Sequence, residues 1–322
     1  MPRHPRLAAV AAATAALAAV AAGPAPTGEP TVSDPRVVAH FDSATGQTPE
    51  NIALEPDGSA DLTFSYARQV ARVTKAGAKT VLATLPEVTD PQTPNLGAAV
   101  VTGIARAHDG TLYVNYATGT DETGVWRIRP GGAPEQIAQL PADSLPNGLA
   151  LDEECGTLYA ADSARGAVWS VPLDGGEPAV WAEGPALEPT AALPFGANGL
   201  KIHDDAVWVS NSAHSTLLRI PFTEDRTAGP VETRATGLTG IDDFTFTGHG
   251  DTALAALILD SRLELVRADG THKTVLTGAD GLTNPTSVAV RAKTLYVPSA
   301  AYYATVNPDP NLLLARISRN KL

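Results

Sequence analysis

Apolar and polar residues alternate in short runs along the chain, and these runs recur as one repeated unit. Each unit opens on a polar residue, continues with an apolar strand pattern, and reaches a second strand after a tight turn. The six units open at Glu50, Thr102, Asn147, Asn198, Asp242 and Thr286. Successive openings are 52, 45, 51, 44 and 44 residues apart, which suits one four-stranded blade of a β-propeller. The pattern therefore predicts an all-β, six-bladed propeller.

The count of outer strands indicates how the ring closes. Five units carry a fourth strand pattern, but the sixth reaches the chain end at Leu322 just after its third strand, 313–317. Residues 37–41 match the missing pattern, so we expect this N-terminal segment to pair with the last blade and cover its open edge. A Rossmann glycine fingerprint and a G-x-S-x-G nucleophile elbow are both absent from the sequence, and a β-sandwich would not require this period.

The N-terminal residues have the pattern of a secretory signal. Arg3 and Arg6 precede an unbroken apolar and threonine-containing run over 7–22, with small residues at its end. We expect a signal peptide over 1–25, a flexible tether over 26–35, and a single propeller domain over 36–322. The protein is then secreted, and the alternative is anchorage at the outer face of the cell membrane.

The net charge limits which partners are expected, and the cysteine content limits how the fold is stabilised. The formal net charge is −12, and loss of Arg3 and Arg6 would make it more negative. A nucleic-acid partner requires a basic surface, so none is expected, and after signal removal no later stretch is apolar enough for stable membrane insertion. Cys155 is the only cysteine, so the fold must be stabilised by packing. A small-molecule substrate is the expected partner.

Propeller topology predicts which side chains share the central pocket. The innermost strand of each blade starts at the axis on one face, which brings together Glu50, Asn147, Asn198 and Asp242. Residues at the ends of second strands are expected at the rim: Tyr66, Asn115, Asp162, Asn211, Asp260 and Tyr302, with His214 in a nearby loop. The crossings 86–101 and 184–197 are rich in proline and alanine and are expected to cover the opening.

Two carboxylates and two amides around one point suit a hard divalent cation, which takes oxygen ligands. Ca²⁺ fits best, with Mg²⁺, Mn²⁺ and Zn²⁺ as alternatives, and open coordination positions would permit catalysis. Other interpretations remain. Asn-Gly pairs are common in turns, Asp243 competes with Asp242 for the inward position, and Asp162 also suits a strand-end hydrogen bond.

In these features the sequence resembles the senescence-marker-protein and gluconolactonase (regucalcin-type) family of six-bladed propellers. The similarity spans 37–322, and its motifs are Pro146-Asn-Gly-Leu-Ala150, Thr157-Leu-Tyr-Ala-Ala-Asp-Ser163, Ala197-Asn-Gly-Leu200 and Val207-Trp-Val-Ser210. The resemblance implies a divalent metal held by Glu50, Asn198 and Asp242. It also implies that Asn147 contacts the substrate or a water molecule on the metal, and that Asp242 is the general base.

The sequence departs from that family's pattern at three places, which involve four residues. Asn51 and Ile52 follow Glu50 where Gly-Pro is frequent, and Asp243 stands where glycine is usual. Leu145 occupies the position of an arginine that sugar-lactone enzymes carry. A substrate less polar than a sugar lactone is therefore expected. The leading hypothesis is a secreted, metal-dependent lactonase- or esterase-like hydrolase, with Asp242 and Asn147 as catalytic residues. The alternatives are a non-catalytic propeller that binds a ligand or protein, and a strictosidine-synthase-like propeller enzyme or a lyase.

Overall fold

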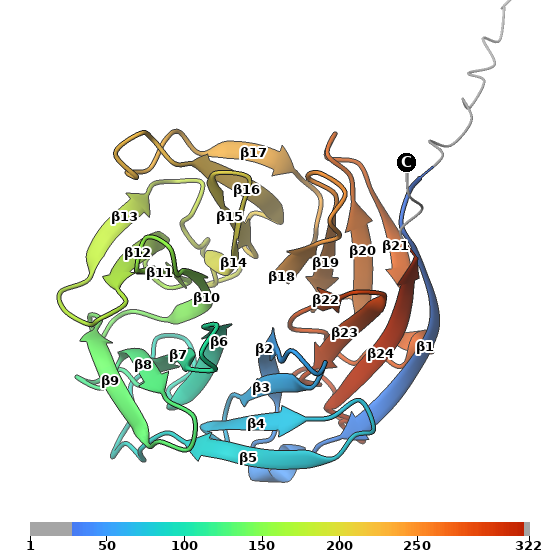
Figure 1. The fold of residues 1–322 in the computed structure, drawn as a ribbon, viewed down its shortest axis with the longest axis horizontal. Coiled ribbons are helices and arrows are strands. Elements are labelled where there is room, and N and C mark those ends of the chain that lie inside the picture. Colours follow the sequence, from blue (N-terminus) through green and yellow to red (C-terminus); the bar gives the residue numbers. More distant parts are fainter. Residues whose placement is uncertain (1–27, 319–322) are drawn as a thin grey trace, which may run out of the picture.

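The computed structural model describes residues 28–318, which form six four-stranded antiparallel sheets around a central axis (Figure 1). This arrangement confirms the predicted six-bladed propeller. Within the described residues, no helix has the length and apolar character needed to span a membrane. The only helical segments there are two short 3-10 turns, η1 (Ser43–Thr45) and η2 (Gly278–Asp280).

The strands follow the chain blade by blade, from the axis outward. The first blade contains β2 (Pro49–Leu54), β3 (Ala60–Phe64), β4 (Gln69–Val73) and β5 (Lys79–Thr84). The second contains β6 (Val100–Arg106), β7 (Leu112–Ala117), β8 (Gly124–Ile128) and β9 (Pro134–Gln139). The third contains β10 (Pro146–Asp152), β11 (Thr157–Asp162), β12 (Ala167–Pro172) and β13 (Ala179–Glu183). The fourth contains β14 (Ala197–His203), β15 (Ala206–Asn211), β16 (Thr216–Pro221) and β17 (Glu232–Ala235). The fifth contains β18 (Ile241–Phe246), β19 (Ala253–Leu257), β20 (Arg262–Val266) and β21 (His272–Leu276).

The sixth blade joins the two ends of the chain. It contains β22 (Ala289–Arg291), β23 (Thr294–Ser299) and β24 (Asn311–Ser318), with β1 (Thr31–His40) as its outer strand. β1 runs antiparallel to β24, from the pair Thr31 and Ser318 to the pair His40 and Asn311. The predicted closure of the ring by an N-terminal strand is confirmed, because the edge of β24 is covered by β1.

β1 begins at Thr31, six residues before the predicted start, so the strand includes half of the segment expected to be a tether. The register shifts between Ser33 and Arg36, around Asp34, whose φ is +54°. Just before the strand, Glu29 forms ion pairs with Arg267 (2.6 Å) and Lys273. The predicted signal peptide over 1–25 lies outside the described residues.

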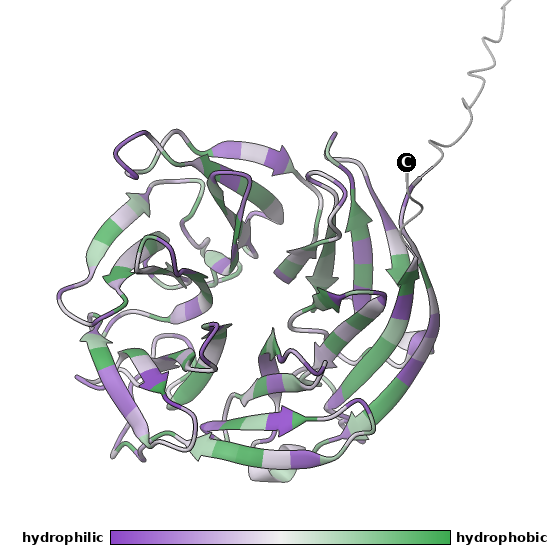
Figure 2. Cartoon of the chain, viewed as in Figure 1, coloured by the Kyte–Doolittle hydropathy of each residue, from purple (hydrophilic) through white to green (hydrophobic). Residues whose placement is uncertain are grey.

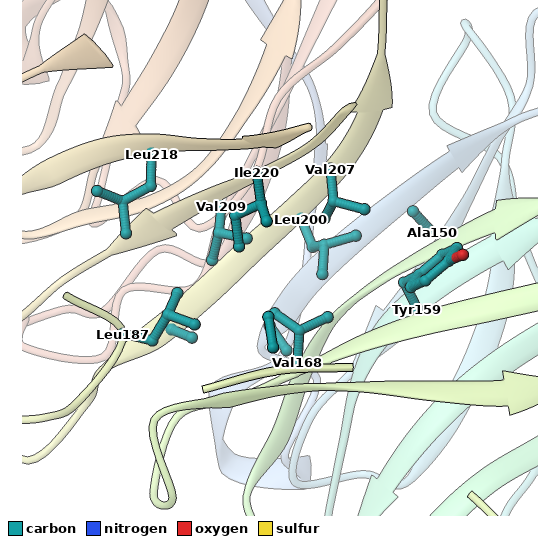
Figure 3. Close-up of a cluster of buried hydrophobic side chains, with 12 residues drawn as sticks. Ala150, Tyr159, Val168, Leu187, Leu200, Val207, Val209, Leu218 and Ile220 are labelled. Carbon is teal, nitrogen blue, oxygen red and sulfur yellow. The ribbon is translucent and has the colours of Figure 1, made fainter. Parts of the chain in front are cut away.

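Packing between blades supplies the core. Figure 2 shows that β20 and β24 are largely apolar, whereas outer strands such as β9 and β17 carry hydrophilic segments. Figure 3 shows one cluster in which Tyr159 and Val168 of the third blade face Leu200 and Val207 of the fourth. Three of the strand tryptophans are buried in such clusters between blades: Trp126, Trp169 and Trp208.

Polar side chains also fasten the inner strands to one another. In each case a side chain of one blade donates to a backbone oxygen of the next blade: Thr63 to Thr102 (2.6 Å), Thr102 to Pro146 (2.6 Å), Asn115 to Asn147 (2.7 Å) and Thr286 to Pro49 (2.9 Å). Because these acceptors lie at the openings of the inner strands, the bonds fix the positions of the side chains that face the axis.

Candidate metal centre

One cavity of about 380 Å³ lies at the axis, and all four of the predicted pocket residues line it. Glu50, Asn147, Asn198 and Asp242 come from β2, β10, β14 and β18, four separate blades. Each of these side chains is buried. The remaining lining residues are Ser65, Tyr66, Leu96, Thr102, Leu145, Leu193, Phe195, Ser212, Gly240, Ile258, Leu259, Tyr302 and Tyr303.

The two Asn-Gly pairs lie within β10 and β14, and not in turns. Their glycines permit close approach of the next inner strand. A Cβ at Gly148 would lie 2.4 Å from the backbone oxygen of Asn198, and one at Gly199 would lie 2.8 Å from that of Asp242. The Asn-Gly sequence therefore reflects tight packing around the axis.

Two serines fix which way the amide groups of Asn147 and Asn198 point. The hydroxyl of Ser163 donates to the first residue of β14 (2.7 Å) and accepts from Nδ2 of Asn147 (3.3 Å). Ser212 likewise donates to the first residue of β18 (2.6 Å) and accepts from Nδ2 of Asn198 (2.9 Å). A hydroxyl has one hydrogen to donate, so each serine accepts from the amide nitrogen and leaves the amide oxygen for another partner.

The side-chain oxygen of Asn198 is buried and has no hydrogen-bond partner within the described part of the chain. A buried acceptor without a partner costs free energy, and a cation would satisfy it. With Glu50 and Asp242 beside it in the same cavity, the donor set consists of oxygens only. This set fits a hard divalent ion such as Ca²⁺.

Tyr302 positions the carboxylate of Glu50. Its hydroxyl donates to Oε2 of Glu50 at 2.6 Å, which leaves Oε1 for another ligand. The pKa of Glu50 is raised from 4.5 to about 7: burial is the largest cause, the bond from Tyr302 opposes the rise, and the negative charge of Asp243 adds to it. Glu50 is thus a carboxylate in an environment that disfavours its charge unless a cation is present.

Asp242 is perturbed in the same direction. Burial raises the pKa of Asp242 well above its ordinary value of 3.8, and the charges of Glu50 and Asp243 raise it further. A contact with Asn198 and the positive charge of Lys201 oppose the rise. A divalent cation beside these two buried carboxylates would stabilise their charged forms.

The structure also separates Asp242 from its neighbour Asp243. Asp242 lines the cavity, whereas Asp243 bonds to Lys201 (2.6 and 2.8 Å), Ser287 (2.6 Å) and Asn51 (3.3 Å). Asn51 and Asp243 are two of the departures from the family pattern, and they contact each other. This buried network was not predicted from the sequence. Its only sign there was that Asn51 and Asp243 both differ from the family pattern.

Of the predicted rim residues, Tyr66 and Tyr302 line the cavity. Three others form hydrogen bonds within the fold instead. Asn115 donates to the backbone of the third blade (2.7 Å), and Asn211 donates to the backbone oxygens of residues 186 and 188 (2.9 and 3.1 Å). Asp162 accepts from the indole of Trp169 (3.0 Å) and from three backbone N–H groups. These side chains are held by backbone groups and therefore lie away from the cavity.

Asp260 and His214 do not line the cavity either. Asp260 forms an ion pair with Arg262, the first residue of β20. The backbone N–H of His214 donates to Oδ1 of Asn211 (2.9 Å), which closes the loop after β15.

Both predicted crossings contribute to the cavity wall. Leu96 comes from the crossing 86–101, and Leu193 and Phe195 come from the crossing 184–197. Nδ2 of Asn95 donates to the backbone oxygen of Pro194 (2.8 Å), so the two crossings are joined next to residues that line the cavity.

A second group of candidate metal ligands lies at the other end of β14. His203, Asp204 and Asp251 offer ligand atoms within 4.8 Å of one another. Nε2 of His203 is 3.3 Å from Asp204 and 3.4 Å from Asp251, distances that a protonated histidine also shows with carboxylates. Asp251 also forms an ion pair with Arg234 (3.2 Å), and none of the three residues lines the axial cavity.

The same fold occurs in solved structures of known proteins. A regucalcin from Agrobacterium tumefaciens, described as a calcium-binding protein, is 18% identical over 88% of this chain and 93% of its own, with a TM-score of 0.64. A gluconolactonase from Xanthomonas campestris is 14% identical over 91% and 99%, with a TM-score of 0.62. Regucalcin and gluconolactonase are the proteins of the family that the sequence was found to resemble. A PQQ-bound aldose sugar dehydrogenase from Streptomyces coelicolor is 18% identical over 91% and 100%, with a TM-score of 0.64.

At these identities the likeness establishes the fold alone. No protein-family model matches the sequence, and no curated protein matches it. Function must therefore be argued from the residues of the cavity.

Proposed function

We propose that this protein is a secreted, divalent-metal-dependent hydrolase that opens a lactone or a related ester in the axial cavity. The observation that carries the proposal is the joint burial of Glu50 and Asp242 beside the side-chain oxygen of Asn198, which has no hydrogen-bond partner among residues 28–318. An N-terminal segment of charged, apolar and small residues supports secretion.

Glu50, Asn198 and Asp242 would hold the ion, with Tyr302 keeping one oxygen of Glu50 occupied. Ca²⁺ fits the all-oxygen donors best, and Mg²⁺, Mn²⁺ or Zn²⁺ are the alternatives to be tested. When bound, the ion polarises the substrate carbonyl and makes a nearby water more acidic.

Asp242 acts as general base. The oxygen of a water molecule attacks the carbonyl carbon while Asp242 takes one of the water's protons. The ring carbon–oxygen bond then breaks, its electron pair stays on the ring oxygen, and that oxygen receives the proton from Asp242, which gives a hydroxy acid. Asn147 orients the attacking water or the substrate, because Ser163 holds its amide nitrogen and leaves its oxygen free.

The substrate is a small molecule less polar than a sugar lactone. Leu145 lies in the cavity wall where a sugar-lactone enzyme would place an arginine, and Phe195 lines the wall with it. Leu145 and Phe195 belong to one apolar cluster. Such a wall offers a sugar hydroxyl no hydrogen-bond partner.

The test combines metal content with turnover. The mature protein should hold one divalent ion per chain and hydrolyse members of a lactone panel, and a chelator should abolish the reaction. Asp242→Asn should lose turnover, whereas Asp260→Asn, an exposed acid outside the cavity, should keep it. Protein that holds no divalent ion and hydrolyses no lactone would refute the proposal and favour a non-catalytic binding propeller.

A further inference from the structure

The cavity is divided into a polar floor and an apolar wall. Its charged and amide groups lie at the openings of the inner strands, as with Glu50 and Asn198. Its apolar groups come from the loops and crossings above, as with Leu193, Phe195 and Leu259. A ligand that fills both parts must have a polar head and an apolar body.

The wall offers no positive charge. Among the described residues that line the cavity there is no lysine, arginine or histidine, whereas Glu50 and Asp242 supply negative charge. An anionic substituent on the substrate would lie without a partner in this wall and is therefore disfavoured. The apolar body must be neutral.

The apolar surface continues outward from the cavity. Tyr66, Leu259 and Tyr303 line the cavity and yet are 40%, 43% and 54% exposed. They account for half of the six large apolar side chains that the described residues expose, and Val306, in the same loop as Tyr303, is a fourth. Leu259 lies over Gly240, where a Cβ would approach its Cγ to 2.5 Å, so this side chain packs against the backbone of Gly240.

We infer that the substrate is a neutral lactone or ester with an extended apolar chain, whose chain leaves the cavity over Leu259 and Tyr303. This inference rests on the proposed function, because it places the reacting carbonyl at the polar floor. The floor then selects the carbonyl group, and the exposed side chains select the length of the chain.

The test is a series of γ-lactones whose linear side chains lengthen from one carbon to eight. Each added methylene that reaches the apolar surface should raise kcat/KM by about threefold to fourfold until the surface is covered. In Leu259→Ser/Tyr303→Ser, each methylene should gain less than about twofold. Both side chains are substantially exposed, so the replacements should fold. Val180→Ser removes an equally exposed apolar side chain from β13, outside the cavity, and should leave the dependence on chain length intact.

A matched series of γ-lactams, which resist hydrolysis, separates the two proposals by calorimetry. Lactams whose affinity rises with chain length, without turnover of any lactone, would refute the hydrolase and support the chain site. Lactones hydrolysed at equal rates whatever their length would support the hydrolase and overturn the chain site. A length dependence that persists in the double variant would also overturn it.

Discussion

Replacing Glu50 with glutamine removes one of the two buried carboxylates and keeps the size of the side chain. The replacement retains an oxygen that can accept the hydrogen bond from Tyr302. The stability of the metal-free protein should respond to this change in a way that depends on pH. The reason is that burial raises the pKa of Glu50 from 4.5 to about 7.

The sign and size follow from proton linkage. Between these two values the folded state keeps a proton on Glu50 that the unfolded state releases, so the free energy of unfolding falls as pH rises from about 4.5 to about 7. The pKa values differ by about 2.5, and each unit corresponds to about 1.4 kcal/mol, which gives about 3 kcal/mol as an upper value. Glu50→Gln should therefore match the wild type at about pH 4.5 and exceed it by up to about 3 kcal/mol at about pH 8.

The assay is urea unfolding of both proteins in chelator at about pH 5 and about pH 8, followed by the same measurement with Ca²⁺. Calcium should stabilise the wild type at the higher pH and leave Glu50→Gln nearly unchanged. A variant that is less stable than the wild type by the same amount at both pH values would contradict the proton linkage of Glu50. Such a result would mean that the carboxylate of Glu50 is stabilised in the fold without a cation.

Further predictions concern the cation, its supports and the closure of the ring. Calcium affinity, measured by calorimetry, should fall by about tenfold per pH unit below the pKa of Glu50 near 7, because the ion must displace a proton; a constant affinity across this range would contradict the site. Ser212→Ala should weaken calcium binding by about tenfold or more, because Asn198 loses the acceptor that orients its amide; unchanged affinity would show that the amide needs no such support. Asp162→Asn should lower the free energy of unfolding by roughly 1 to 3 kcal/mol while calcium binding stays intact. A loss of calcium binding would instead show that Asp162 is part of the metal site. Deletion of residues 1–36 removes six of the ten residues of β1, the strand that closes the ring. Scanning calorimetry should therefore show a lower Tm than for the full chain, and light scattering should show that aggregation begins earlier.

The repeat and its closure could be predicted because they depend on local patterns. The six polar openings mark the inner strands, and the missing sixth outer strand indicated the N-terminal segment. The true start of β1 could not be predicted, because Asp34 and Pro35 interrupt the strand pattern. The structure accommodates them in a register shift, with Asp34 at a positive φ.

The candidate site was predictable for the same geometric reason, since equivalent openings of the blades meet at the axis. The rim was less predictable, because the side chains of Asn115, Asp162 and Asn211 bond to backbone groups that lie far away in sequence or in irregular loops. The bond between Asn51 and Asp243 joins residues 192 positions apart, so no local pattern could reveal it.

We propose that Glu50, Asn198 and Asp242 share one divalent cation, with Asn147 facing the water or substrate beside it. Anomalous diffraction from crystals soaked in Mn²⁺ tests it most directly, since Mn²⁺ accepts the same oxygen ligands. We expect a single strong peak in the axial cavity, in contact with Glu50 and Asp242, and its loss in Asp242→Asn. A peak only beside His203, or no peak at all, would contradict it.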